Sequence, residues 1–275
     1  MDWNPRPLDP ADVFVHRRGN GRPLVLLHCL GMDWHFWDVL DPLAGRFELI
    51  AYSFPGHHDT PLPKGPYGEA ELVEQLHALL KREGIGRASI AGISMGGSLA
   101  QAFAGTYPEM VDRAILLDCT PRYTDEARAN WPVRAELARK NGVKSLIPML
   151  EKVFFTKASL DENGPNVRHV KEKWAMCSGE GYALGCEWLA RLDAREQARR
   201  MTMPTLVMLG SNEGQPFKDS ARWMADNIPG SQASSRCRMP ATPRCASGRS
   251  SCCRSSGASS PDPRPIDKAA VPASD

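Results

Sequence analysis

Hydrophobic runs alternate with amphipathic segments along residues 1–120. The runs are short and continuously apolar, which is typical of strands that are covered on both faces. The segments between them repeat apolar residues at helical spacing, as at Leu72, Leu76, Leu79 and Leu80. Strands that alternate with helices predict a mostly parallel sheet with helices on both faces, the α/β class. The expected strands are 12–16, 23–28, 47–52, 88–93 and 114–118, and the expected helices are 34–43, 69–81 and 95–106.

The pattern changes at residue 121 and again near residue 200. Residues 121–200 are charged and helical, without a convincing strand, which predicts a helical lid inserted into the α/β core. The core resumes over 201–231, with a strand at 204–210 and a helix after it. Residues 232–275 contain no Leu, Phe, Tyr, Trp or Glu. Such a segment buries too little apolar surface to offset its ordering entropy, so we expect a disordered tail there.

Composition excludes several classes of function. The net charge of +2, with 42% hydrophobic and 24% charged residues, is ordinary for a soluble protein and favours neither nucleic acid nor a membrane surface as partner. No apolar run reaches the ~20 residues of a spanning helix, and Met1–Arg6 lacks the pattern of a signal peptide. We therefore expect a cytoplasmic protein. The eight cysteines show neither a CxxC pair nor zinc spacing, and we expect no metal or other cofactor.

One stretch carries clear chemistry. The strand at 88–93 runs into Gly92–Gly96, which reads Gly-x-Ser-x-Gly, and an Ala-rich helix follows. This arrangement is the nucleophile elbow, in which the glycines permit a sharp turn and the serine is exposed above the sheet. The alternative is a glycine-rich turn with a bystander serine. The strand before and the helix after favour Ser94 as the nucleophile, with the backbone N–H of Met95 as an oxyanion donor at the helix N-terminus.

Two further motifs lie at the ends of the expected strands 23–28 and 47–52. His28–Asp33 with Trp37 and Asp38 looks like an oxyanion loop, and Tyr52–His57 looks like an Asp-x-Arg-Gly-His turn. Through these motifs and the elbow, the chain resembles the α/β-hydrolase superfamily, and within it the 3-oxoadipate enol-lactonases and related lactone and ester hydrolases. The resemblance implies two-step acyl transfer from a small ester or lactone, with the N–H of Leu30 as the second oxyanion donor.

The acid of the expected triad follows the strand that ends at Gly210, because the order in this fold is Ser, acid, His. The family favours Asp three residues beyond that glycine, and this chain has Glu213 there. Asp118, at the end of the preceding strand, is the alternative acid. Its other interpretation is a carboxylate that caps a loop.

No histidine follows the acid. The seven histidines all lie at or before His169, which falls in the lid, and His28 is expected to be structural. If most third codon bases are G or C, the shifted reading frame from Arg238 to Pro243 encodes Asp-Ala-Gly-His-Ala, which looks like the family's histidine motif. We therefore hypothesise that a frameshift near 232–236 replaced the final strand, the catalytic histidine and the closing helix.

These observations leave several functions open. The leading one is a serine hydrolase of esters or lactones, impaired in this chain because its base is missing. The same fold also supports C–C bond hydrolysis and cofactor-free perhydrolysis, and the missing histidine favours a non-catalytic relative that binds acyl ligands. Three lid arginines are candidate partners for a substrate carboxylate: Arg122, Arg134 and Arg168.

Overall fold

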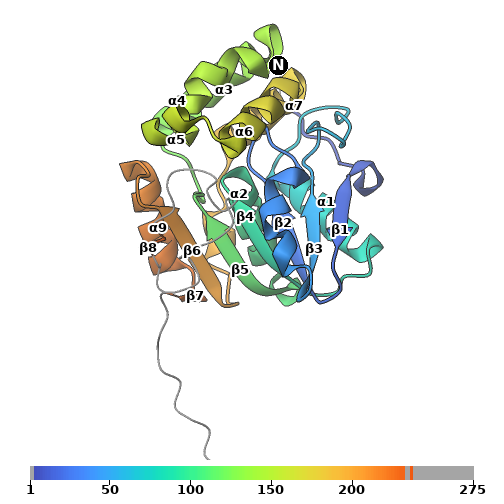
Figure 1. Ribbon diagram of the computed structural model, residues 1–275. Helices are drawn as coiled ribbons and strands as arrows, with labels where there is room; N and C mark the ends of the chain where they lie inside the picture. The colour runs from blue at the N-terminus through green and yellow to red at the C-terminus, as the bar shows by residue number, and fades with distance from the viewer. Residues whose placement is uncertain (1–2, 233–235, 238–275) are drawn as a thin grey trace, which may run out of the picture.

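A twisted sheet occupies the centre of the molecule (Figure 1). The computed structural model describes residues 3–232 and 236–237. The sheet runs in the order β1-β3-β2-β4-β5-β6-β7, and β8 also pairs with β6. β1 is antiparallel to β3, and the other described pairings are parallel, which confirms the predicted mostly parallel sheet. The strands are β1 (Val15–Arg18), β2 (Arg22–Leu27), β3 (Phe47–Tyr52), β4 (Ala88–Ile93), β5 (Val111–Leu117), β6 (Thr205–Gly210), β7 (Ser231–Gln232) and β8 (Arg236–Cys237).

Alternate residues of each strand feed two separate hydrophobic cores. In β2, Val25 and Leu27 belong to the larger core with α1 and α2, whereas Leu24 and Leu26 pack with Trp37 on the other face. This two-sided burial explains why the strands read as continuous apolar runs. The helices are α1 (Glu69–Arg82), α2 (Met95–Thr106), α3 (Asp125–Asn141), α4 (Ile147–Phe154), α5 (Lys157–Glu162), α6 (Pro165–Met176), α7 (Gly179–Arg191), α8 (Arg195–Ala198) and α9 (Gln215–Asn227), with short 3₁₀ helices that include Trp34–Leu43.

The described helices cover the two faces unequally. α1, α2 and α9 contribute to the larger core, and the 3₁₀ helix Trp34–Leu43 packs on the other face. On this second face, Ile115 pairs with Leu206 and Leu117 with Met208, and all four side chains are only half-buried. An apolar strip across β5 and β6 is therefore incompletely covered by the described residues.

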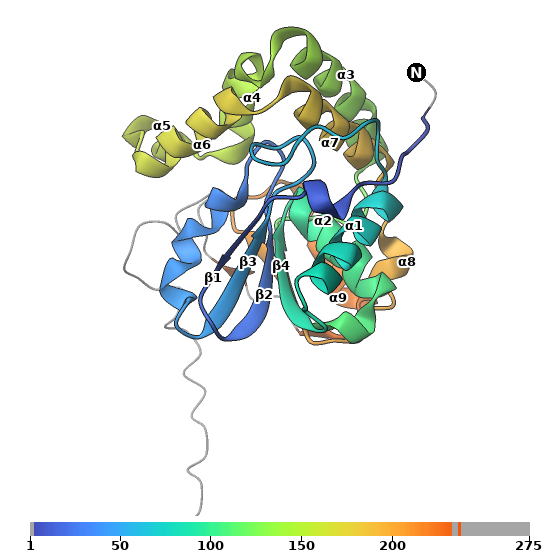
Figure 2. The same cartoon turned by 90° about the vertical axis from the view of Figure 1, so that its right-hand side faces the viewer.

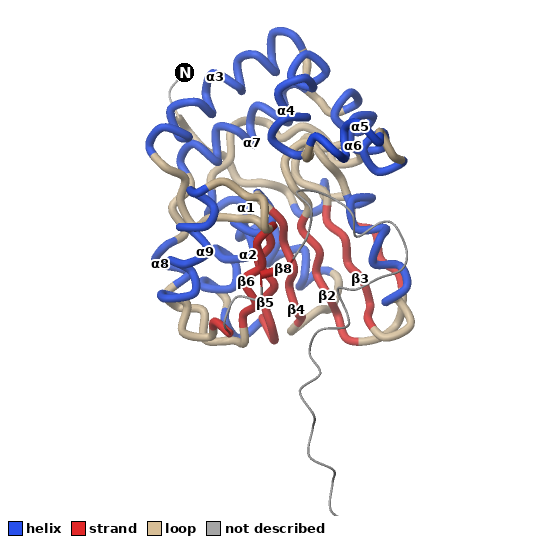
Figure 3. The backbone as a smooth tube through the Cα atoms, turned by 60° about the vertical axis from the view of Figure 1, so that its left-hand side comes forward, coloured by secondary structure: helices blue, strands red, loops and turns tan. Residues whose placement is uncertain are grey.

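The segment between β5 and β6 forms the predicted helical lid. Helices α3 to α7 lie across the carboxyl ends of the strands (Figures 2 and 3). α7 rests directly on the turn after β3. The two backbones are so close that a Cβ on Gly181 would lie 2.0 Å from the carbonyl oxygen of Gly56. Only glycine permits this approach of helix and turn, and Gly56 itself has a φ of +74°. The contact fixes one side of the lid to the core.

The sheet continues beyond residue 231, where the sequence predicted the end of the α/β core. Gln232 pairs with Leu206 in β7, and Arg236–Cys237 pair with Leu209–Gly210 in β8. Parallel pairing uses backbone groups, so it does not require apolar side chains. Residues 233–235 and 238–275, which hold the rest of the predicted tail and frameshift, lie outside the described residues. Among the described helices, none is both long and apolar enough to cross a membrane.

Candidate active site

Ser94 adopts the strained backbone of an elbow. Its φ of 51° and ψ of −116° lie in a region that non-glycine residues rarely occupy, and it immediately precedes α2. The turn has no space for larger neighbours, since a Cβ on Gly96 would lie 2.1 Å from the Leu27 carbonyl oxygen. A Cβ on Gly92 would similarly lie 2.2 Å from the carbonyl oxygen of Gly96. The two glycines of the motif therefore allow β4 and α2 to meet at Ser94.

Backbone hydrogen bonds join the ends of three neighbouring strands at this point. The N–H of Ser94 donates to the Leu117 carbonyl at 2.9 Å, and the N–H of Asp118 donates to the Met208 carbonyl at 3.0 Å. The side chain of Asp118 accepts from the N–H of Gly210 at 2.7 Å. The carboxyl ends of β4, β5 and β6 therefore place Ser94, Asp118 and the turn at Gly210 next to one another.

A cavity of about 320 Å³ opens between these strand ends and the lid. Of the residues predicted for the site, Ser94, Leu30, Asp118 and Glu213 all line it. Met95 does not line it, and its side chain is fully buried, as suits a residue expected to contribute only its backbone N–H. The structure therefore brings the predicted residues together at one place.

The two candidate acids lie close to each other beside Gly210. A Cβ built on Gly210 would lie 3.6 Å from Glu213 Oε1 and 3.7 Å from Asp118 Oδ1. Burial, with the nearby charge of Asp118, raises the pKa of Glu213 to about 7. Burial also raises the pKa of Asp118, although its bond from Gly210 opposes the shift. Both carboxyls face the cavity, so the geometry alone does not separate their roles.

None of the seven histidines, all within the described residues, lines the cavity. His28 is fully buried beneath the predicted oxyanion loop. It accepts a hydrogen bond from the N–H of Phe54 at Nε2 (3.0 Å), so Nδ1 carries the proton and donates to the Cys29 carbonyl (2.8 Å). Burial lowers the pKa of His28 well below its ordinary value. This agrees with the structural role expected for His28.

The lid supplies aromatic and cationic groups to the other wall. Tyr123 lines the cavity, and its side chain is hydrogen-bonded to Ser94. Arg134 lies over the rings of Trp131 and Tyr182, with its Cζ 5.0 Å and 5.7 Å from their centroids. The Nε of Arg134 and the indole Nε1 of Trp131 are buried without a hydrogen-bond acceptor in the structure. This wall therefore places a guanidinium and unpaired N–H donors beside the cavity, a setting that suits an anionic ligand.

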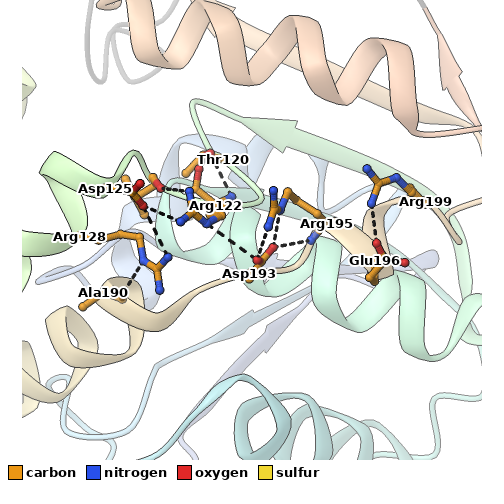
Figure 4. A network of polar contacts seen from close by, with 10 residues as sticks. Thr120, Arg122, Asp125, Arg128, Ala190, Asp193, Arg195, Glu196 and Arg199 are labelled. Carbon is orange, nitrogen blue, oxygen red and sulfur yellow. Dashed lines mark hydrogen bonds and ion pairs between the residues drawn. The ribbon is translucent and has the colours of Figure 1, made fainter.

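The three candidate lid arginines differ in their partners. Arg122 lines the cavity but pairs with Asp125 at 2.6 Å and faces Asp193, which Arg195 also binds (Figure 4). Arg168 donates to the Asn163 carbonyl at 2.5 Å and does not line the cavity. Arg134 lines the cavity and has no carboxylate partner among the described residues. Arg134 is thus the arginine best placed to meet a ligand.

Two features of the site escaped the sequence analysis. No sequence motif marks the hydrogen bond between Tyr123 and Ser94, because a tyrosine after a strand is common in folded proteins. The proximity of Asp118 and Glu213 follows from adjacent strand ends, which the strand order alone reveals. Trp131 and Tyr182 of the lid also line the cavity.

Comparison with known proteins places this geometry in a family. Residues 22–143 match the family described as alpha/beta hydrolase fold. The 3-oxoadipate enol-lactonase 2 of Acinetobacter baylyi is 31% identical over 206 residues, which cover 74% of this chain and 76% of that protein. The chain therefore belongs to the α/β-hydrolase family, as its motifs predicted.

Two further relatives refine the likeness. A pimeloyl-[acyl-carrier protein] methyl ester esterase of Legionella pneumophila is 29% identical, over 72% of this chain and 79% of its own length. The crystal structure of the enol-lactonase from Burkholderia xenovorans aligns with a TM-score of 0.76 and 26% identity, covering 80% of this chain and 86% of that one. The relatives named here are thus lactone and ester hydrolases.

Proposed function

We propose that this chain is built as a hydrolase of carboxylic esters or lactones with Ser94 as its nucleophile. The observation that carries the proposal is the strained backbone of Ser94 at the head of α2, within a cavity shared with Leu30 and two carboxyls. A serine in this position is exposed to a substrate carbonyl, and the helix N-terminus favours negative charge there. The similarity to a lactonase and to a methyl ester esterase supports the reaction class.

The proposed chemistry is two-step acyl transfer. Ser94 Oγ attacks the carbonyl carbon, the backbone N–H groups of Leu30 and Met95 stabilise the oxyanion, and the alkoxide leaves with a proton. Water then attacks the acyl-enzyme, releases the acid and returns the proton to Ser94. Each step requires a base that takes a proton and gives it back, and a carboxyl from Glu213 or Asp118 would orient that base.

We further propose that the acyl group carries a carboxylate. Arg134 and Trp131 present buried, unsatisfied donors on the lid wall of the same cavity. A guanidinium that stacks on aromatic rings and lacks an internal carboxylate is well suited to bind an anionic group. The bound carboxylate would satisfy both donors and fix the distance of the scissile bond from Ser94.

The chain as it stands is expected to be impaired, because no histidine reaches the cavity. The half-buried strip at Ile115, Leu117, Leu206 and Met208 supports the hypothesis that a closing helix was lost with the base. A frame-restored protein, in which the shifted frame is read from the 232–236 region onward, would regain both. Loss of the base in a serine hydrolase typically costs about 10⁶ in kcat.

The test compares this chain with the frame-restored protein in fluorophosphonate labelling and p-nitrophenyl ester assays. We expect activity in the frame-restored protein, almost none in this chain, and none in either after Ser94→Ala. An inactive, folded frame-restored protein would contradict the hydrolase proposal. Robust esterase activity of the present chain that disappears with Ser94→Ala would contradict the impairment.

The second candidate is a binding protein for acyl carboxylates. It is favoured by the lack of a histidine at a cavity that keeps its unsatisfied donors. Calorimetric titration of this chain with short acyl carboxylates would support it if binding is seen while both proteins fail to turn over esters. A panel of diketone and peroxide substrates would separate C–C hydrolysis and perhydrolysis from ester cleavage.

A further inference from the structure

The loop that carries Leu30 is held from two sides. From below, His28 bonds the carbonyl of Cys29 and the N–H of Phe54, which ties the loop to the end of β3. From above, three lid contacts fall on Leu30–Asp33. The side chain of Leu30 contacts α7, where a Cβ on Gly185 would lie 2.6 Å from Leu30 Cδ1.

The next residue, Gly31, also faces the lid. Its φ is +80°, and a Cβ built on it would lie 3.1 Å from side-chain atoms of both Trp174 and Tyr182. Glycine is thus required here both by backbone conformation and by the close approach of α6 and α7. Gly31, which directly follows Leu30, is therefore packed beneath the lid.

The third contact is a buried ion pair. Lys173 of α6 donates from Nζ to Asp33 Oδ2 at 2.7 Å, across 140 residues of sequence. Asp33 is 1% exposed and the Lys173 side chain 14% exposed. The same carboxylate oxygen lies 3.4 Å from His58 Nδ1, and Oδ1 accepts from the N–H of His35 at 3.0 Å. Asp33 thereby links the lid to the loop and to the first turn of the helix after it.

We propose that Lys173 is a positioning residue that holds the oxyanion loop through Asp33, so that the N–H of Leu30 is in place only while α6 is docked. This inference rests on the proposed function, in which Leu30 supplies an oxyanion donor. Lys173 does not line the cavity; its side chain acts through Asp33, whereas its backbone is hydrogen-bonded to His58. Because the carboxylate is almost fully buried, the pair is little screened by solvent, and loss of the lysine leaves the buried charge with only His58 and the N–H of His35 beside it.

The first test is hydrogen exchange on the present chain. Lys173→Met is expected to raise amide exchange in residues 28–36 by about tenfold or more, while α1 and α2 stay protected. Lys171→Met is the matched control, since Lys171 lies on the same helix but pairs with Glu151 at the surface. Lys173→Arg, which keeps the charge, is expected to restore protection. Unchanged exchange at 28–36 in Lys173→Met would overturn the proposal.

A second variant distinguishes positioning of the loop by the ion pair from the destabilisation caused by an unpaired, buried Asp33 carboxylate. Asp33→Asn with Lys173→Met removes both charges and keeps an acceptor for His35. If it folds with the parent's melting temperature but residues 28–36 still exchange rapidly, the ionic link positions the loop. Parent-like protection would show that the link is dispensable.

The final measurement is fluorophosphonate labelling of Ser94 in the frame-restored protein. Lys173→Met is expected to lower the maximal labelling rate about 10²-fold with little change in the half-saturating probe concentration, because a misplaced donor weakens the transition state rather than binding. Equal maximal rates in Lys173→Met and its parent would contradict the inference alone. Absence of labelling in the unsubstituted frame-restored protein would contradict the proposed function itself, whereas the exchange result would still stand.

Discussion

The side chain of Asp118 accepts a 2.7 Å hydrogen bond from the N–H of Gly210, 92 residues further along the chain. This bond aligns one candidate acid with the turn that carries the other, and it occupies one of the Asp118 oxygens. The Glu213 carboxyl also has a backbone hydrogen bond, at Gly214, and Glu213 follows β6, where the order of the triad in this fold places the acid. We therefore propose the orienting role for Glu213 and a supporting role for Asp118.

We therefore predict that Glu213→Gln lowers kcat of the frame-restored protein about 10³-fold, because a neutral amide stabilises an imidazolium poorly. Asp118→Asn keeps an oxygen for the Gly210 bond and is expected to cost about tenfold or less. Ester hydrolysis under saturating substrate measures both, with the exposed Asp219→Asn on α9 as control. The opposite ranking would make Asp118 the acid.

The raised pKa of Glu213 predicts a pH-dependent stability. The folded chain holds this proton up to about pH 7, whereas the unfolded chain loses it near its ordinary pKa of 4.5. Folding therefore binds a proton between these values, and the carboxyl destabilises the fold increasingly as pH rises from 4.5 to 7. Glu213→Gln should raise the free energy of unfolding by about 1 kcal/mol at pH 8, a figure reduced for solvent screening of a half-exposed group, and by little at pH 4.

Urea denaturation at the two pH values measures this difference. Glu196→Gln serves as control, because Glu196 is a well-exposed carboxyl on the surface. A stabilisation that is equal at both pH values would contradict the assigned proton.

Arg134 is predicted to select anionic substrates. In the frame-restored protein, Arg134→Met should raise KM about 10- to 100-fold for an ester whose acyl chain ends in a carboxylate, since charged hydrogen bonds contribute about 1.5–3 kcal/mol. The matched neutral methyl ester should change little. Arg168→Met, which removes an arginine outside the cavity, is the control. Equal losses for both esters would mean that Arg134 supports the lid and not the substrate.

The close packing of the elbow predicts that alanine is tolerated far less well at Gly96 than at Gly86. Gly96→Ala would place a methyl group 2.1 Å from the Leu27 carbonyl oxygen, so it should destabilise the chain by about 3 kcal/mol or prevent folding. A Cβ on Gly86 would meet no atom within 4 Å, and Gly86→Ala should leave stability within about 1 kcal/mol of the parent. Thermal unfolding followed by circular dichroism distinguishes the two. A stable Gly96→Ala chain would argue against the packed turn.

Much of the core could be predicted from local sequence. The strands at 23–28, 47–52 and 88–93 were identifiable because each is buried on both faces and reads as an apolar run. The first strand was expected at 12–16 but lies at Val15–Arg18. Its register is set by pairing with β3 and by ion pairs of Arg17 with Glu48 and of Arg18 with Asp38, which a search for apolar residues passes over.

The site was predictable only in part. The turn at Ser94 carries a local motif, because its geometry depends on glycines within two residues. The link between Asp33 and Lys173 joins positions 140 residues apart, and neither residue has a neighbour that marks it. The choice among three arginines likewise depended on which of them had found an internal partner. Such choices are made by tertiary packing and leave no periodic trace in the sequence.

Two lid helices, α6 and α7, contact the core directly. α7 is seated on Gly56, and α6 is tied to Asp33. Val153 and Phe154 of α4 line the cavity, and Val153 is 60% exposed. Phe154 also packs against Trp174, with ring centroids 5.0 Å apart, and Trp174 in turn approaches Gly31 of the loop that carries Leu30. A change in the acyl-chain entrance at α4 is therefore expected to reach the loop around Leu30 as well.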